Sequence, residues 1–240
     1  MSGRIAIVTG GSRGIGRAIV ERLSADGMQI LTCGRGPRPD GLPEQVAWVR
    51  ADVSVPQDAA RIVNETRQQF GPASVLVNNA GVQVERTVAD STDDDWDLVV
   101  GVNCRGVFNM CRAVLPAMQE DGGSIVNIGS ISGVVSDPSM ALYNASKAFV
   151  HGLTRSIAID HGPKVRCNAI RPGWIMTDMA DDAFALADDP GAAKSDALAR
   201  HAAGRFGQPE DVANAVAWLS SDEAGYITGQ CFTIDGGLTA

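Results

Sequence analysis

The feature that most constrains the fold is an alternation, along the whole chain, of short apolar runs with longer helical patterns. The apolar runs are rich in Val and Ile, as expected of strands covered on both faces, and they fall at 4–9, 28–33, 46–51, 74–77, 124–129, 165–170 and 230–234. Helical patterns occupy 15–26, 57–70, 93–120, 141–161 and 209–220. The alternation predicts right-handed βαβ crossovers, and therefore an α/β fold with a doubly wound parallel sheet of about seven strands and helices on both faces.

Length and composition fit a single domain over residues 1–240. The chain is 45% hydrophobic and 20% charged and contains no internal repeat or linker, so it can bury a sizeable core. Its formal net charge of −8 argues against a nucleic-acid partner. No apolar stretch approaches the roughly 20 residues that span a bilayer, and the N-terminus lacks the apolar core of a cleavable signal. We therefore expect a cytoplasmic protein with no membrane partner.

Neither the cysteines nor the histidines indicate a disulfide framework or a metal site. The five cysteines are scattered and lack a C-x-x-C pair, so reduced and mostly buried thiols are expected. His151, His161 and His201 have no spacing typical of metal ligands. We expect them on helix surfaces or at interfaces, and we expect no metal.

Two segments depart from the alternation. Residues 34–41 are too rich in Pro and Gly to hold a helix, so the crossover there should be an irregular loop. Residues 176–208 contain a long stretch of small and acidic residues with a Pro190-Gly191 interruption. An insertion of this length at the carboxyl end of a sheet often acts as a lid, so 179–208 is predicted to be a substrate loop or lid. A plain surface pair of helices is the alternative.

The first predicted strand runs directly into a glycine-rich loop that opens a helix. This loop reads Thr9-Gly10-Gly11-Ser12-Arg13-Gly14-Ile15-Gly16. Glycines at 10, 14 and 16 allow a tight turn and let the backbone approach a pyrophosphate at the helix N-terminus. A glycine pattern between a strand and a helix is typical of a Rossmann-type dinucleotide site.

Tyr143 and Lys147 lie one helical turn apart and share a face of the predicted helix 141–161. There the ammonium can lower the pKa of the phenol from about 10 by favouring the anion. A phenol shifted in this way can give or take a proton at a carbonyl or alcohol oxygen. A surface Tyr/Lys pair is the alternative, and the motifs that precede the pair disfavour it.

The order of these motifs resembles that of the short-chain dehydrogenases/reductases over nearly the whole chain. The glycine loop has that family's T-G-x-x-x-G-x-G spacing, and Ser130, Tyr143 and Lys147 match its S…YxxxK. Further matches are Asn78-Asn79-Ala80-Gly81, Asn103, Pro172-Gly173 with Thr177, residues 207–213 and Asp235-Gly236-Gly237. The resemblance implies an oxidoreductase that transfers a hydride between a nicotinamide cofactor and a secondary alcohol or ketone.

The resemblance also implies roles for four catalytic residues. Tyr143 would be the general acid in reduction and the general base in oxidation, and Lys147 would lower its pKa and bind the nicotinamide ribose. Ser130 would donate to the substrate oxygen, with Ser132 as a nearby alternative. Asn103 would hold a water that links Lys147 to solvent, or it is an ordinary amide of the helix interior.

The tip of the second strand bears on the choice of cofactor. An NAD site carries a carboxylate there for the ribose 2′-hydroxyl, whereas this chain has Gly34-Arg35. Arg35 and Arg13 suit a 2′-phosphate, so NADP(H) is favoured over NAD(H), and Gly34→Asp should move the preference towards NAD. The cofactor-binding residues that the resemblance implies are Gly10, Ser12, Arg13, Gly14, Ile15, Gly16, Arg35, Asp52, Val53, Asn79, Ala80, Gly81, Tyr143, Lys147, Pro172, Gly173, Ile175 and Thr177.

The substrate pocket is expected to be mostly apolar, which favours a neutral or partly hydrophobic ketone or alcohol. A stand-alone carbonyl reductase or alcohol dehydrogenase and a 3-oxoacyl-carrier-protein reductase both fit, and a non-catalytic nucleotide-binding member is the third alternative. The resemblance also implies a homotetramer in which helices 93–120 and 141–161 pair. The expected pocket residues are Ser132, Met140, Trp174 and Met179, together with Val84, Val134 and the 180–203 segment.

Overall fold

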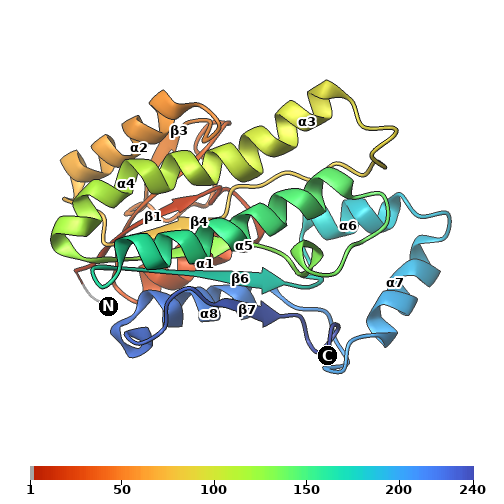
Figure 1. Ribbon diagram of the computed structural model, residues 1–240. Coiled ribbons are helices and arrows are strands. Elements are labelled where there is room, and N and C mark those ends of the chain that lie inside the picture. The colour runs from red at the N-terminus through yellow and green to blue at the C-terminus, as the bar shows by residue number, and fades with distance from the viewer. Residues whose placement is uncertain (1–2) are drawn as a thin grey trace.

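The computed structural model describes residues 3–240, which form a seven-stranded sheet with helices on both faces (Figure 1). All neighbouring strands are parallel, in the order β3-β2-β1-β4-β5-β6-β7. The order changes direction between β1 and β4, which creates a crevice at their carboxyl ends. The predicted fold class is confirmed. The strands are β1 (Ile5–Thr9), β2 (Gln29–Gly34), β3 (Ala47–Arg50), β4 (Val75–Asn78), β5 (Gly123–Ile128), β6 (Val165–Pro172) and β7 (Cys231–Ile234).

Helices α1 (Gly14–Ala25) and α8 (Pro209–Ser220) pack together against one face of the sheet. The other face is covered by α2 (Pro56–Gln69), α4 (Val107–Asp121) and α5 (Ala141–His161). The predicted helix 93–120 consists of α3 (Asp93–Val100), a π-helical segment η1 (Gly101–Gly106) and α4. The described crossover from β2 to β3 holds no helix, as expected for residues 34–41.

The predicted lid segment contains two short helices, α6 (Asp178–Ala185) and α7 (Pro190–Ala199). Figure 1 shows both beyond the carboxyl end of β6, with α7 standing away from the sheet. Two single-turn 3-10 helices complete the structure, η2 (Ile131–Gly133) after β5 and η3 (Asp222–Ala224) after α8.

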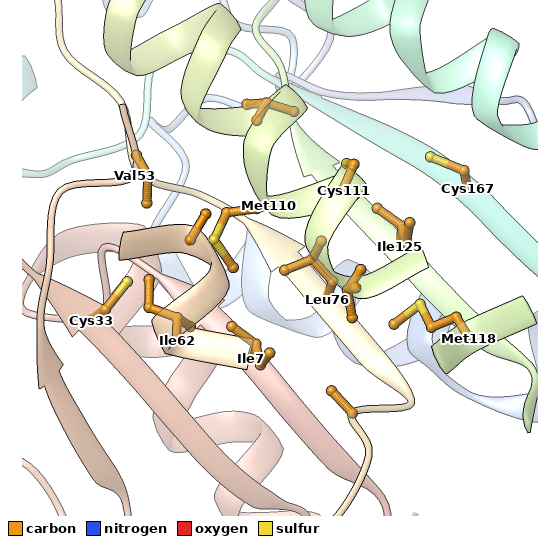
Figure 2. Close-up of a cluster of buried hydrophobic side chains, with 14 of the residues drawn as sticks. Ile7, Cys33, Val53, Ile62, Leu76, Met110, Cys111, Met118, Ile125 and Cys167 are labelled. Carbon is orange, nitrogen blue, oxygen red and sulfur yellow. The ribbon is translucent and has the colours of Figure 1, made fainter. Parts of the chain in front are cut away.

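The core on the α2, α4 and α5 side is a continuous layer of aliphatic and sulfur-containing side chains (Figure 2). Ile7 of β1 and Leu76 of β4 meet Ile62 of α2 and Met110 of α4, and all four are fully buried. The next strand residue, Val8, belongs to the core on the opposite face. Because each strand is buried on both faces, its sequence is an unbroken apolar run rather than an alternating one.

Two expectations about cysteine and membrane character have different outcomes. Four of the five cysteines are buried and all five are free, as expected. The continuous helix Asp93–Asp121, however, is long and apolar enough to span a bilayer by length and composition, so the expectation that no stretch approaches that length is wrong. Its most apolar window is 61% buried inside the protein, which is the behaviour of a core helix.

The expected placement of the histidines is wrong for two of the three. His151 and His201 are each only 5% exposed, while His161 contacts Gln119 through its Nδ1 at 2.8 Å. Between residues 3 and 240, no group of His, Cys, Asp and Glu has the arrangement of a metal site.

Candidate active site

A cavity of about 350 Å³ follows the carboxyl ends of the strands. Its walls come from the glycine loop, the tips of β2 and β3, and the segments that follow β4, β5 and β6. Every residue predicted above to bind the cofactor lines it. The predicted catalytic and pocket residues also line it, apart from Asn103, Val84 and Val134, but of the predicted 180–203 segment only Ala180 and Ala183 do.

The glycine loop has a backbone that only glycine adopts readily. Gly10 and Gly14 have φ angles of 71° and 54°, in the left-handed region. A Cβ on Gly16 would lie 2.2 Å from the carbonyl oxygen of Gly10. Any side chain at position 16 would therefore clash with the backbone of the loop. Helix α1 then begins without a side-chain cap at Arg13, which leaves its first N–H groups for an anion. These residues fit the pyrophosphate of a dinucleotide.

Asn79 and Thr9 fasten the glycine loop to the segment after β4. The Asn79 Nδ2 donates to the carbonyl oxygens of Thr9 and Gly10 at 2.9 and 3.1 Å. The Thr9 hydroxyl oxygen accepts from the N–H groups of Asn79 and Ala80, both at 3.0 Å. The side of the cavity where the pyrophosphate is expected is therefore set by contacts between two parallel strands.

The two arginines predicted to select NADP(H) both line the cavity. Arg13 Nη1 lies 2.9 Å from Asp178 Oδ2, and the two side chains are 73% and 65% exposed. An ion pair so exposed contributes roughly 0–1 kcal/mol, so Arg13 can exchange Asp178 for another anion. Arg35 is exposed at the β2 tip.

The proposed Gly34→Asp exchange proves to be a poor probe of cofactor choice. A Cβ on Gly34 would lie 2.8 Å from Cη2 of Trp48, so any side chain there displaces the indole ring. Asp52, another residue predicted to bind the cofactor, is held by Ser54: its Oδ1 accepts from the N–H and hydroxyl of Ser54 at 2.9 and 2.7 Å. Those bonds hold the carboxylate at the cavity wall beside Val53.

Ser130, Tyr143 and Lys147 meet at the cavity although thirteen and four positions separate them along the chain. Ser130 ends the segment after β5 and caps the turn η2, where its hydroxyl oxygen accepts from the N–H of Ser132 at 3.1 Å. Lys147 is 6% exposed and its Nζ donates to the carbonyl of Ile128 at 3.0 Å. The same Nζ lies 5.4 Å from the centroid of the Tyr143 ring.

The expectation that Lys147 lowers the pKa of Tyr143 is wrong for the protein as it stands. Burial raises the pKa of Tyr143 to about 12, a hydrogen bond with the Ser130 hydroxyl opposes the rise, and the Asp137 carboxylate adds to it. Burial also lowers the pKa of Lys147 to about 8. Desolvation disfavours both charged forms and outweighs the attraction that the sequence spacing suggested.

Asn103 lies behind the cavity wall rather than in it. The π-helical turn η1 carries it, and such turns are frequent at functional sites. Its Oδ1 accepts from the N–H of Val82 at 2.9 Å, and its Nδ2 donates to the Val82 carbonyl and to the Ser146 hydroxyl at 2.8 and 3.0 Å. A Cβ on Gly81 would lie 3.4 Å from this Oδ1 and 3.6 Å from Lys147 Nζ, so Asn103 is a neighbour of the lysine.

The segment after β6 is held by the C-terminal part of the chain. Met176 N–H donates to the carbonyl of Gly207 at 2.9 Å, and Gly207 N–H donates to that of Trp174 at 3.0 Å. A Cβ on Gly173 would lie 2.7 Å from Cβ of Asp235. The motifs at 207–213 and 235–237 therefore support the segment after β6, which carries the predicted cofactor-binding residues Gly173, Ile175 and Thr177.

An aromatic cluster attaches the α6–α7 region to the rest of the protein. Trp174 stacks on Phe184 with ring centroids 4.6 Å apart, Phe206 lies 5.7 Å from Phe184, and His201 lies 5.2 Å from Phe206. Trp174 and Met179 line the cavity as predicted. Val84 does not, and Val134 is 63% exposed and borders only a shallow neighbouring depression.

Two charged residues that line the cavity, Asp137 and Asp178, were not predicted from the sequence. Asp137 lines the cavity and its Oδ2 accepts from the Ser132 hydroxyl at 2.7 Å. The expected pocket was apolar, and nothing in the run Gly133–Met140 distinguishes this aspartate from a surface one. Only the turn that precedes α5 brings it to Ser132.

Comparisons with known proteins agree with this geometry. The family model described as Enoyl-(Acyl carrier protein) reductase matches residues 10–239. A 3-oxoacyl-[acyl-carrier-protein] reductase of Thermotoga maritima is 36% identical over 248 residues, which cover 99% of this chain and 98% of that protein. An NADP-dependent (R)-specific alcohol dehydrogenase of Lentilactobacillus kefiri is 34% identical over 252 residues, which cover 100% and 98%.

Among solved structures, the ligand-free aldohexose dehydrogenase of Thermoplasma acidophilum superposes with a TM-score of 0.92. It is 34% identical, and the match covers 98% of this chain and 94% of that one. The family model and these relatives extend over nearly the whole chain, including the glycine loop, the Ser130–Tyr143–Lys147 cluster and the C-terminal segments that support them. The chain therefore belongs to the short-chain dehydrogenase/reductase family of oxidoreductases.

Proposed function

We propose that this protein transfers a hydride between NADP(H) and a small secondary alcohol or ketone, with Tyr143 as the general acid/base. The observation that carries the proposal is a shared cavity: Ser130, Tyr143 and Lys147 line the same space as the glycine loop. A dinucleotide held by its pyrophosphate at that loop would extend along the cavity towards the hydroxyl groups. A non-catalytic nucleotide-binding protein would have no use for this cluster.

The protein's contribution to cofactor binding divides among the cavity walls. The glycine loop and the start of α1 would hold the pyrophosphate, and Arg35 with Arg13 would hold a 2′-phosphate. Asp52 and Val53 would contact the adenine. Ile175 and Thr177 would bind the carboxamide, and Lys147 the ribose beside it. The bound nicotinamide supplies the hydride chemistry.

The remaining chemistry is proton transfer and polarisation at the substrate oxygen. With its pKa raised to about 12, Tyr143 is protonated at neutral pH and can donate to a carbonyl oxygen as negative charge develops there. Ser130 would donate a hydrogen bond to the same oxygen. Lys147 would stabilise the phenolate that remains, and Asn103, next to Lys147, would support the return of the proton through a water.

The α6–α7 region favours a small molecule over an acyl-carrier protein. Residues 178–199 contain six aspartates and one lysine, and a carrier-protein substrate would dock through a basic surface. The similarity to a protein named 3-oxoacyl-[acyl-carrier-protein] reductase keeps that reaction as the second candidate. Ser132, Met140, Trp174 and Met179 would form the pocket, and 179–208 would act as its lid.

A substrate and cofactor panel tests the proposal. Small ketones, their alcohols and a 3-oxoacyl-carrier thioester are assayed with NADPH/NADP and NADH/NAD in parallel. We expect turnover of small ketones with NADPH, and we expect Arg35→Ala to reduce the NADPH preference by about tenfold, the value of one charge-assisted contact of roughly 1.4 kcal/mol. Turnover of the carrier thioester alone would favour the second candidate, and firm NADPH binding with no turnover of any compound would contradict both.

We also infer a cytoplasmic homotetramer. Its interface would use the faces of α4 and α5, where Phe108 and Phe149 are 43% and 41% exposed. Large apolar side chains in such positions are typical of protein–protein contact surfaces. Light scattering on the purified protein is expected to give four times the chain mass, and a monomer would refute the inference.

A further inference from the structure

Two serine hydroxyls beside Tyr143 lead to a carboxylate that the proposed function does not use. Ser130, which acts on the pKa of the Tyr143 phenol, has its Oγ 3.1 Å from Ser132 Oγ, and Ser132 Oγ lies 2.7 Å from Asp137 Oδ2. All four residues line the cavity, and the two serines are only 8% and 7% exposed. The series therefore runs along the wall of the site itself.

The carboxylate gives this series a direction. An ionised carboxylate can only accept hydrogen bonds, whereas a hydroxyl has a single proton to donate. The Ser132 hydroxyl must therefore donate its hydrogen bond to Asp137, and its oxygen accepts a hydrogen bond from Ser130. Ser130 in turn accepts from the N–H of Ser132 at 3.1 Å. One charge therefore aligns the O–H groups of both serines.

Asp137 is held in place by a constrained turn. Ser139, two residues later, has a φ of 55°, a value that non-glycine residues adopt only where the surrounding structure enforces it. The enforcing contacts are present: Asn144 Nδ2 donates to the Asp137 carbonyl at 3.1 Å, and Met140 forms an isolated bridge with Arg86. The position of the carboxylate is thus determined by the fold rather than by solvent.

The charged and titratable groups around Tyr143 come from three elements. Asp137 approaches from the turn before α5 and raises the pKa of the phenol. Lys147 lies one turn further along α5. The Cys104 group of η1 acts to raise the pKa of that lysine, against the larger effect of burial. The other charged residues that line the cavity are Arg13, Arg35, Asp52 and Asp178. A change of charge at position 137 therefore has a direct effect on the phenol.

We propose that Asp137 is a positioning residue, which binds the only proton of Ser132 and so leaves Ser130 as the hydroxyl that donates to the substrate oxygen. The proposal rests on the proposed function, because it requires Tyr143 and a substrate oxygen at this place. When that oxygen binds, Ser130 turns its O–H from Ser132 to the substrate. The Ser132 hydroxyl stays bound to Asp137 and cannot compete for the substrate oxygen, which agrees with the thirteen-residue spacing to Tyr143 that favours Ser130 over Ser132.

The first test is Asp137→Asn, which preserves the shape of the side chain but removes the charge and adds a donor. We expect kcat for ketone reduction to fall about tenfold, the effect of losing a hydrogen bond to a charged group, with the Kd for NADPH unchanged. The pH at which reduction fails on the alkaline side should also decrease, because a negative charge beside the phenol is gone. Asp160→Asn removes an equal charge from the exposed end of α5 and should leave kcat and pH profile unchanged.

The second test separates the hydrogen-bonded route from a general effect of charge. Ser132→Ala breaks the link between Asp137 and Ser130 without touching the turn, and it should lower kcat to a similar extent. The double variant should be no worse than either single one, because both remove the same interaction. Ser132→Ala also decides the matter if Asp137→Asn fails to fold. Fully multiplicative losses, or an Asp137→Asn enzyme with the wild-type kcat and pH profile, would overturn the proposal.

The outcome for Tyr143→Phe keeps the two proposals apart. If that variant loses turnover while Asp137→Asn behaves as wild type, only the positioning role fails. If Tyr143→Phe keeps its activity, the acid/base assignment fails instead.

Discussion

The proposed catalytic residues and the α6–α7 region border the same cavity, but they are held in place in different ways. Ser130 and Lys147 are almost fully buried. Ser130 is bonded to the backbone of η2, and Lys147 to the carbonyl of Ile128 at the end of β5. In α6 only Ala180 and Phe184 are buried, and no residue within α7 is. The contrast is what the proposed function requires if the sheet positions the catalytic residues and the α6–α7 region selects the substrate.

The largest expected effect is that of Tyr143→Phe. Loss of the phenol hydroxyl removes the proposed acid/base, which typically costs a factor of about 10² to 10⁴ in kcat. The Kd for NADPH should stay within about twofold, since the glycine loop and both arginines are untouched. Steady-state kinetics and fluorescence titration check the two parts. Activity near that of the wild type would show that the buried cluster does not carry the chemistry.

The second prediction concerns the free energy of burying Lys147. Its pKa is lowered from 10.5 to about 8, so the unfolded chain binds more protons between these pH values and stability should increase with pH across that window. Relative to Lys147→Met, the gain is about 3 kcal/mol. Tyr143, with its pKa raised from 10 to about 12, has the opposite effect above pH 10 in both proteins, so the difference between them isolates the lysine.

Urea unfolding of the cofactor-free proteins at several pH values measures this difference. The buried thiols also have raised pKa values, but they are common to both proteins and cancel in the comparison. A pH-independent difference between wild type and Lys147→Met would mean that the lysine keeps its charge in a well-solvated environment.

The third prediction addresses the α6–α7 region directly. Phe184→Ala removes the stacking on Trp174, a contact worth about 0.5–1.5 kcal/mol beyond burial. KM for the ketone should rise by roughly two- to twelvefold, whereas kcat should change little because Tyr143 stands on α5. Leu198→Ala, on the unburied surface of α7, is the matched control and should alter neither constant. A fall in kcat as large as the rise in KM would contradict the idea that the α6–α7 region affects substrate binding but not the chemical step.

The smallest expected effect is that of Asp178→Asn, at the one described ion pair between the glycine loop and α6. An exposed pair contributes roughly 0.2–1 kcal/mol, so the melting temperature should change by no more than about 4 °C. The Kd for NADPH should decrease by up to about fivefold, since Arg13 no longer has to leave a carboxylate. A weaker affinity for NADPH would show that Asp178 assists the cofactor rather than competing with it.

Much of the fold and site could be predicted because the relevant signals are local. The seven strands and the helices α1, α2, α5 and α8 begin and end within a residue or two of their predicted positions, since each element corresponds to a pattern of residues that are neighbours in the chain. The glycine loop was predictable for the same reason. Gly10 and Gly14 occupy backbone conformations that other residues avoid.

The errors concern burial and distant contacts. Trp48 makes Gly34 a poor site for an aspartate, and it reaches that glycine only because β2 and β3 are paired. His151 and His201 were expected on surfaces and are buried. Asp137 joins Ser132 through a turn whose conformation depends on Asn144. None of these contacts leaves a pattern that can be recognised along the chain.

By itself, the sequence determined which elements form and which side chains converge at the carboxyl ends of the strands, because the apolar periodicity and the glycine positions depend on residues that are neighbours in the chain. The tertiary structure alone decided the electrostatics of the site. Tyr143 and Lys147 share a helix face as predicted, yet their pKa values move in the directions set by desolvation. Desolvation depends on every group that surrounds a side chain, and that set exists only once the chain has folded.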